Sequence, residues 1–270
     1  MDQGGTEPRI DYYPCRYGAS EVEFRGPPVP LRAPYAVVLG GCEAYGRHVE
    51  DPFPELLAER TGMRVVNLGV HCGGLDAYAR DPALTPVIAN AETVIIQVLP
   101  AANMSNRFYS VHPRRNDRFL RHSPILQALF PDTDFCDFVF TRHLLSGLRR
   151  ASRDKFSIVV RELEEAWIAR MRLILTRVNG RAWLLRIEGR VDPDLGPEPL
   201  FVPQAISDRL KPLVEGVVRC DVSDLVAAPG RGAPSGDAGR SSVRATLAAE
   251  HHRIAEALAA RLGGEGWAAA

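Results

Sequence analysis

Cys42 is the residue of this 270-residue chain with the clearest chemical potential, because it follows the apolar run at 36–41. Such a run is typical of a strand covered on both faces, and the glycines that end it permit a tight turn. The thiol would then lie at the carboxyl end of a parallel sheet, where open α/β folds bind ligands. Cys42 is therefore a candidate nucleophile, with Glu43 as a candidate ligand contact. A small residue packed at a strand end is an equally good interpretation of Cys42.

A thiol nucleophile needs a nearby base or a lowered pKa, and two histidines are candidates for the base. His71 follows the second predicted strand, whose tip should point the same way as that of the first. His251 lies on an apolar stripe of the last predicted helix, with Val243, Leu247, Ile254, Leu258 and Leu262. An inward histidine can also be a satisfied core residue, so both interpretations stay open.

An insertion at about 101–152 is rich in arginine, histidine and aromatic residues and directly follows the third predicted strand. Guanidinium groups bind carboxylate, sulfate or phosphate through paired hydrogen bonds. We therefore expect Arg107, Arg114 and Arg115 to form an anion-binding wall that reaches the cleft. The alternative is that neighbouring acids, such as Asp117, already pair with these arginines.

The elements that would position these groups alternate between strand and helix. Strands are predicted at 35–39, 64–70, 93–99, 182–187 and 217–221, and helices at about 51–62, 74–91, 155–178, 203–215 and 242–262. This alternation predicts an α/β fold, a three-layer α/β/α sandwich with a five-stranded, mainly parallel sheet of order 2-1-3-4-5. We expect an N-terminal arm at 1–33 and one domain at 34–265.

The three strand tips resemble those of the SGNH (GDSL-type) hydrolase superfamily. In that family the first strand ends in Gly-Asp-Ser, the second near an oxyanion-hole glycine, and the third in Gly-x-Asn-Asp. The resemblance implies that Cys42 takes the nucleophile place and Asn103 the asparagine place. It implies Gly69 as the oxyanion-hole glycine, with Gly73 as the alternative register and a possible ligand contact.

This sequence departs from the SGNH pattern at four points, the first of which is Cys42 in the place of serine. Gly41 stands where the family has aspartate, Pro100-Ala-Ala-Asn103 replaces Gly-x-Asn-Asp, and the late Asp-x-x-His is absent from its expected place. The whole chain also resembles an uncharacterised bacterial domain family of SGNH-like type, through the phrases at 11–20 and 103–121. That second resemblance implies no known activity.

Composition excludes several classes of function. The 33 basic and 33 acidic residues cancel, so neither nucleic acid nor a membrane is an expected partner. No apolar run reaches the roughly 18 residues of a membrane-spanning helix. The chain has no C-x-x-C pair, no G-x-G-x-x-G after the first strand and no Walker A motif, so we expect no metal and no NAD or ATP cofactor. Five irregularly spaced cysteines and the lack of a visible secretion signal indicate the cytoplasm.

Two functions fit these observations. The first is an SGNH-like hydrolase or acyl-transfer enzyme, acting on an ester of an anionic or sugar-containing substrate. The second is a catalytically degenerate domain of the same type that binds a glycan, an anionic ligand or a protein partner. A histidine nitrogen within about 4 Å of the Cys42 sulfur would favour the enzyme. The sequence does not determine the oligomeric state.

Overall fold

A five-stranded parallel sheet forms the centre of the molecule. The computed structural model describes residues 10–225 and 237–263, with the backbone alone for 237–242. Its strands are β1 (Ala36–Gly40), β2 (Val65–Gly69), β3 (Thr93–Gln97), β6 (Arg181–Glu188) and β9 (Gly216–Asp221). They lie in the order β2-β1-β3-β6-β9, and each neighbouring pair is parallel. The predicted fold and strand order are confirmed.

Both faces of the sheet are covered, as the apolar run of β1 predicted. Successive side chains of a strand point to opposite faces. Val37 and Leu39 accordingly pack into one apolar cluster, and Ala36 and Val38 into the other. All five residues of β1 are buried, so the central strand fixes the position of the turn that follows it.

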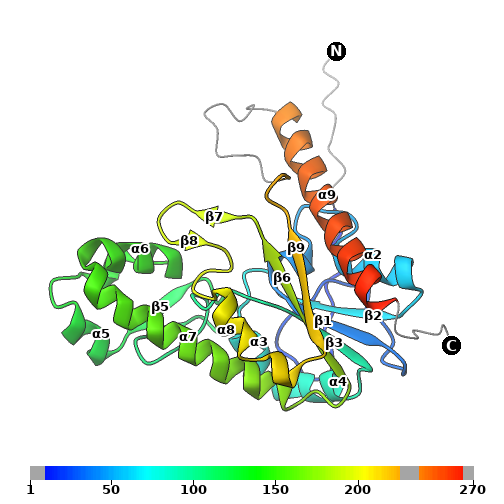
Figure 1. Ribbon diagram of the computed structural model, residues 1–270, viewed down its shortest axis with the longest axis horizontal. Helices are drawn as coiled ribbons and strands as arrows, with labels where there is room; N and C mark the ends of the chain where they lie inside the picture. Colours follow the sequence, from blue (N-terminus) through cyan, green and yellow to red (C-terminus); the bar gives the residue numbers. More distant parts are fainter. Residues whose placement is uncertain (1–9, 226–236, 264–270) are drawn as a thin grey trace.

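Helices form the two outer layers (Figure 1). One apolar cluster lies beneath α2 (Phe53–Thr61) and α9 (Asp237–Leu262). The other lies beneath the longer α7 (Arg153–Leu175) and three shorter helices, α3 (Asp76–Ala79), α4 (Thr85–Ala89) and α8 (Gln204–Asp208). No helix within the described ranges has the length and apolar character needed to cross a bilayer.

Two predicted helices are broken by proline. The segment at 74–91 forms α3, a 3₁₀ turn (Pro82–Leu84) and α4. The segment at 203–215 forms α8 and a 3₁₀ turn (Lys211–Leu213). Proline lacks the N–H of a helix interior and clashes with the preceding turn. Pro82, Pro86 and Pro212 accordingly each lie at the first or second residue of a new short helix or turn.

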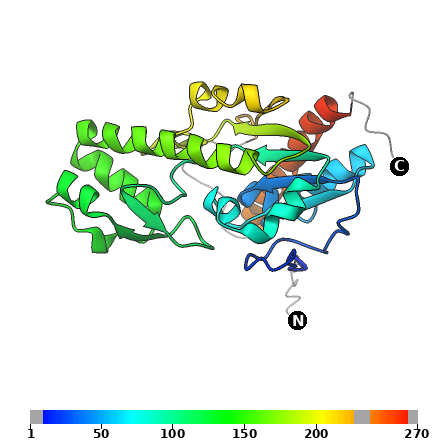
Figure 2. The same ribbon diagram turned by 90° about the horizontal axis from the view of Figure 1, so that it is seen from below.

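The insertion extends sideways from the sheet (Figures 1 and 2). It contains an antiparallel pair of strands, β4 (Tyr109–Val111) and β5 (Phe119–His122), followed by α5 (Pro124–Leu129) and α6 (Thr141–Ala151). The long helix α7 joins this lobe to the sheet (Figure 2). A second small hairpin, β7 (Val191–Asp192) and β8 (Gly196–Pro197), follows β6.

The described part of the N-terminal arm, residues 10–33, is packed against the domain, and residues 1–9 of the predicted arm lie outside the described residues. Tyr17 and Phe24 are buried in the cluster beneath α7. Arg25 is also buried, and its Nη1 donates hydrogen bonds to the carbonyl oxygens of Gly46 (2.8 Å) and Val49 (2.9 Å). Both carbonyls belong to the loop between β1 and α2, so the arm holds the chain that follows Cys42.

Candidate active site

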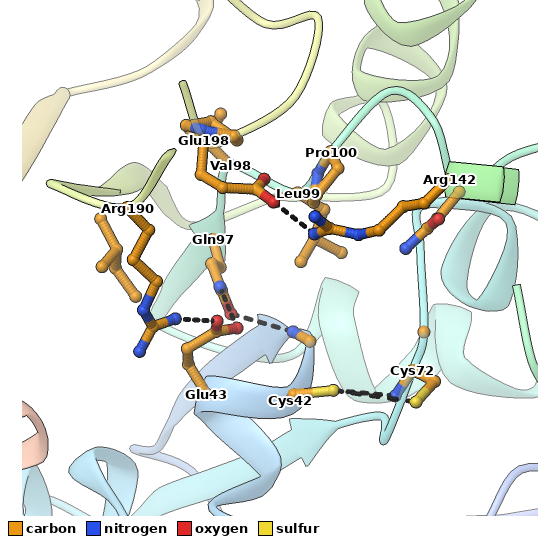
Figure 3. Close-up of a pocket in the computed structure, with 15 residues that line it drawn as sticks. Cys42, Glu43, Cys72, Gln97, Val98, Leu99, Pro100, Arg142, Arg190 and Glu198 are labelled. Carbon is orange, nitrogen blue, oxygen red and sulfur yellow. Dashed lines mark hydrogen bonds and ion pairs between the residues drawn. The ribbon is translucent and has the colours of Figure 1, made fainter. Parts of the chain in front are cut away.

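A pocket of about 170 Å³ opens at the carboxyl ends of the central strands (Figure 3). Cys42 lies on its wall as the first residue of α1 (Cys42–Tyr45), directly after β1. The turn before Cys42 is held because the N–H of Gly41 donates to Oε1 of Gln97 at 2.9 Å. Gln97 is the last residue of β3, so two neighbouring strands together position the thiol.

His71 lies beside Cys42, as the convergence of the first two strand tips predicted. Nδ1 of His71 is 3.5 Å from Sγ of Cys42. The β1–β2 pairing brings them together, because Gly40 lies opposite Gly69 in the parallel register.

Cys72 is a second thiol at this position, and no sequence motif marks it as a site residue. Its Sγ lies 4.0 Å from Sγ of Cys42, and its N–H donates to the same Cys42 sulfur at 3.1 Å. Nε2 of His71 is 3.4 Å from Sγ of Cys72. Cys72 has a φ of 57°, a left-handed conformation that is uncommon for a residue with a side chain. Strained backbone of this kind is concentrated at functional sites.

Arg47 determines which nitrogen of His71 carries the proton. Its Nη1 is 2.7 Å from Nε2 of His71. A guanidinium only donates, so Nε2 is the acceptor and the proton of the neutral ring is on Nδ1, which faces Cys42. Burial lowers the pKa of His71, and the charges of Arg47 and Arg115 lower it further. His71 is therefore a neutral hydrogen-bond donor to the sulfur, which corrects its predicted role as the base.

The surroundings of the two thiols shift their pKa values in opposite directions. The hydrogen bond from Cys42 lowers the pKa of Cys72, and Arg115, whose Nη2 is 3.9 Å from that sulfur, acts in the same direction. The contact with Cys72, burial and the charge of Glu43 all raise the pKa of Cys42. The first thiolate therefore forms on Cys72, and Cys42 remains the protonated partner.

Glu43 is engaged by its neighbours within the pocket wall. Gln97 Nε2 donates to Glu43 Oε2 at 2.8 Å, and Arg190 Nη1 donates to Oε1 at 2.6 Å (Figure 3). Arg190 also pairs with Glu250 of α9. Burial raises the pKa of Glu43, but the Arg190 charge and the Gln97 hydrogen bond outweigh burial, so the pKa falls below its ordinary value. Glu43 is an ionised structural link between α1 and α9.

The backbone amides proposed for an oxyanion hole are occupied. Gly69 donates its N–H to Oδ1 of Asn67 at 2.8 Å, and Gly73 donates to the Val70 carbonyl at 2.9 Å. Asn103 does line the pocket, and its Oδ1 accepts a hydrogen bond from Thr141 Oγ1 at 2.8 Å. Because Thr141 engages the Asn103 oxygen, the amide nitrogen is the group that the Asn103 side chain can offer as a donor.

Comparison with known proteins identifies the family of this chain. The model of a domain of unknown function, DUF6473, matches residues 1–265. The chain belongs to this family. No curated protein matches it. Among solved structures, it is similar to a salicylyl-acyltransferase, SsfX3, from a tetracycline biosynthetic pathway, with 13% identity and a TM-score of 0.38. That match covers 88% of this chain and 58% of the other, so this chain spans less than two thirds of the matched protein's length.

His251 of this DUF6473 domain is a structural residue. Its Nδ1 accepts a hydrogen bond from the N–H of Phe53 at 2.9 Å, and its ring stacks on that of Phe53. Burial lowers the pKa of His251 to about 4. The ring thus caps the start of α2. Because its acceptor nitrogen is already engaged by Phe53, His251 cannot take a proton from Cys42, and the prediction of His251 as an alternative base is corrected.

The predicted wall of three arginines does not form in this domain. Arg107 is paired with Glu162 of α7, through both its Nε (2.6 Å) and a short contact from Nη2. Arg114 lines a different cavity, whereas Arg115 approaches Cys72 and pairs with Asp117 at 3.4 Å. These pairings, and the divergence of the three side chains, contradict the prediction.

The arginines that line the candidate pocket are Arg142 of α6 and Arg190, which follows β6. Arg142 pairs with Asp192 at 2.7 Å and also with Glu198 (Figure 3). Since Arg190 likewise pairs with two carboxylates, the pocket holds matched charges rather than an excess of positive charge.

A metal ion is the remaining chemical possibility for the thiol cluster. The ligand atoms of Cys42, His71 and Cys72 lie within 4.8 Å of one another. Two thiolates and an imidazole are ligands that suit Zn²⁺. No metal was expected from the sequence because the chain has no C-x-x-C pair, and the tertiary structure brings this cluster together without one. The guanidiniums of Arg47 and Arg115 adjoin the cluster, and their positive charges oppose a bound cation.

Proposed function

We propose that this domain is a thiol-dependent hydrolase or acyl-transfer enzyme of SGNH-like type, with Cys42 as the nucleophile. The observation that carries the proposal is the 3.5 Å contact between Sγ of Cys42 and Nδ1 of His71 at the pocket wall. A hydrogen bond from Nδ1–H to the sulfur, and another from the N–H of Cys72, favour negative charge on Cys42 as it reacts.

Cys72 is the proposed proton acceptor. As Cys42 attacks an ester carbonyl, the carbon–sulfur bond forms and the S–H proton passes to the Cys72 thiolate, 4.0 Å away. The departing alkoxide takes that proton from Cys72 as the carbon–oxygen bond breaks. Water, or the hydroxyl of an acceptor, then attacks the thioester and releases Cys42 as the thiol.

Two donors are proposed for the oxyanion. The N–H of Cys42 lies at the first helical residue, where no intrahelical acceptor exists. The amide nitrogen of Asn103 is the second, because Thr141 occupies the Asn103 oxygen. Donors directed at the developing charge in this way are a main source of rate enhancement in acyl transfer.

Sugar-containing esters suit the pocket better than strongly anionic ones. Arg142 and Arg190 each already contact two carboxylates, so an incoming anion would have to displace an existing partner. Sugar hydroxyls can instead donate to the carboxylates and accept from the guanidiniums without breaking the pairs. We therefore propose an O-acylated sugar as the substrate class.

The test compares three cysteine variants on p-nitrophenyl acetate and on a peracetylated monosaccharide. Cys42→Ala should abolish turnover, and Cys72→Ala should reduce it by about a hundredfold, the lower end of the range for general acid–base groups. Cys136→Ala is the matched control, since Cys136 is exposed on the insertion, and it should retain parental turnover. Equal turnover by Cys42→Ala and the parent above the buffer rate would remove Cys42 from the mechanism. Turnover by the parent at the buffer rate, with binding of the acetylated monosaccharide, would instead support the degenerate ligand-binding domain.

A further inference from the structure

We propose that Cys42 and Cys72 form a reversible disulfide when the protein meets a peroxide, with Cys72 as the sulfur that is oxidised first. This modification does not depend on the acyl-transfer activity. It would block that activity if Cys42 is the nucleophile, because the bonded sulfur could no longer attack a carbonyl.

The geometry brings the two sulfurs close to bonding distance. They lie 4.0 Å apart on the wall of one pocket, and both residues are partly exposed. A disulfide has a sulfur–sulfur bond of about 2.05 Å, so closure requires a displacement of roughly 2 Å, within the reach of side-chain rotation. The N–H of Cys72 already points at the Cys42 sulfur.

The surroundings of Cys72 favour its thiolate, which is the form that reacts with peroxide. The Cys42 thiol donates to the Cys72 sulfur at 4.0 Å, and Arg115 places Nη2 at 3.9 Å from the same sulfur. Both contacts lower the pKa of Cys72. Asp117 acts in the opposite direction, but it is itself paired with Arg115.

The chemistry balances with hydrogen peroxide as the oxidant. The Cys72 thiolate attacks one peroxide oxygen, so a sulfur–oxygen bond forms, the oxygen–oxygen bond breaks and hydroxide leaves. The Cys42 sulfur then attacks the Cys72 sulfenic acid; the sulfur–sulfur bond forms, and the Cys42 proton leaves with the hydroxyl group as water. A dithiol reductant reverses the product by thiol–disulfide exchange.

The other three cysteines lack these features. Cys220 is buried in β9. Cys136 is exposed beside Asp134, whose charge raises its pKa. Burial raises the pKa of the Cys15 thiol. Within the described residues, Cys42 and Cys72 are therefore the pair on which oxidation should concentrate.

The experiment reads the thiols directly and needs no substrate. The full-length, reduced protein is treated with a small excess of hydrogen peroxide, alkylated in denaturant and digested with trypsin. Cys42 and Cys72 are the single cysteines of the tryptic peptides 33–47 and 65–80, so a disulfide between them appears as one linked species. We expect this species to dominate, to form at the expense of two alkylated thiols per chain, and to disappear with dithiothreitol.

Variants assign the order of the two steps. Cys42→Ser should stop at a Cys72 sulfenic acid that dimedone traps, whereas Cys72→Ser should leave Cys42 largely unoxidised. Arg115→Met should slow the loss of the Cys72 thiol several-fold without preventing the disulfide. Cys15→Ser, which replaces another partly buried cysteine, should form the linked peptides as the parent does.

Two results would overturn the inference. One is oxidation of Cys72 to the sulfinic acid in the parent protein with no linked peptides. The other is one zinc ion per purified chain that is lost in Cys42→Ser and protects both thiols from peroxide, since the cluster would then be a metal site. The first result does not bear on ester turnover by the reduced protein, whereas the second would also remove Cys42 as a free nucleophile. Metal analysis and the turnover of Cys42→Ala therefore distinguish the failure of this inference from the failure of the proposed activity.

Discussion

Arg47 and His71 share a 2.7 Å hydrogen bond that directs the proton of the imidazole toward the sulfur of Cys42. A histidine beside a cysteine is usually interpreted as a base, but here its outer nitrogen is already an acceptor. The proposed assignment of the base to Cys72 rather than His71 therefore depends on Arg47, which does not line the pocket. Because the charge of Arg47 lowers the pKa of His71, a change at Arg47 should be detectable as a change in that pKa.

Arg47→Gln should raise the pKa of His71 toward its ordinary value of about 6.5. Burial still lowers it, but one of the two neighbouring positive charges is gone. The measurement is an NMR titration of the His71 ring. Arg60→Gln, in α2 and paired with Glu256, is the control and should leave that titration unchanged. A His71 titration that does not move in Arg47→Gln would show that the contact is absent in solution.

His251→Gln should flatten the acid dependence of stability. The folded-state pKa of His251 is lowered to about 4. Between the unfolded pKa and this value, the unfolded chain therefore binds a proton at His251 and the folded chain does not. The stability that neutral His251 contributes to the folded state is complete above the unfolded pKa of about 6.5, and it is lost as the pH falls toward 4. Glutamine can still accept from Phe53 but does not titrate. Urea unfolding of both proteins at pH 7 and pH 5 checks this, and parallel losses of stability would contradict it.

Arg190→Met should destabilise the domain by about 3 kcal/mol at neutral pH, the lower end of the range for breaking a buried pair. The change leaves the Glu43 and Glu250 carboxylates without their shared cation. The folded-state pKa of Glu43 should then rise, and because the folded chain would take up a proton more readily, part of the loss should be recovered as the pH falls toward 5. Arg209→Met, which removes an exposed pair with Glu165, should change the free energy of unfolding by less than about 1 kcal/mol.

Gly40→Ala should disturb the position of Cys42. A Cβ at this residue would lie 2.5 Å from both Ala44 Cβ and Gln97 Oε1, the oxygen that holds the N–H of Gly41. Overpacking of this kind costs about 1–3 kcal/mol, and the rate of Cys42 alkylation by iodoacetamide should change with it. Gly41→Ala is the milder comparison, because its Cβ would meet Leu99 Cδ2 at 3.0 Å. Equal stability and labelling for Gly40→Ala and the parent would show that the turn can relax.

The fold was predictable from the sequence because both faces of the central strands are buried, which produces continuous apolar runs. The proximity of His71 to Cys42 followed from the same logic, since parallel neighbours end at one edge. Cys72 directly follows His71, so the same strand-tip logic could have placed it near Cys42. It was missed because no motif marks two cysteines thirty residues apart as a pair.

The arginines show where local sequence patterns stop being informative. Arg107 was selected for its neighbours along the chain, but its partner Glu162 is 55 residues away on α7. Arg142 and Arg190 enter the pocket because the insertion and the segment after β6 fold back toward the strand tips. These approaches depend on tertiary packing, and no periodicity within either segment encodes them.

Arg25 links the described part of the N-terminal arm to the candidate site, although none of residues 10–33 lines its pocket. Its guanidinium ties the carbonyls of Gly46 and Val49, while Tyr12 packs on Tyr45 and Tyr45 packs on His71. A fragment that begins at residue 34 would retain every strand and every pocket side chain, yet it would lose the groups that brace the loop behind Cys42. The smallest piece expected to support the proposed thiol chemistry is therefore larger than the smallest piece that contains the sheet.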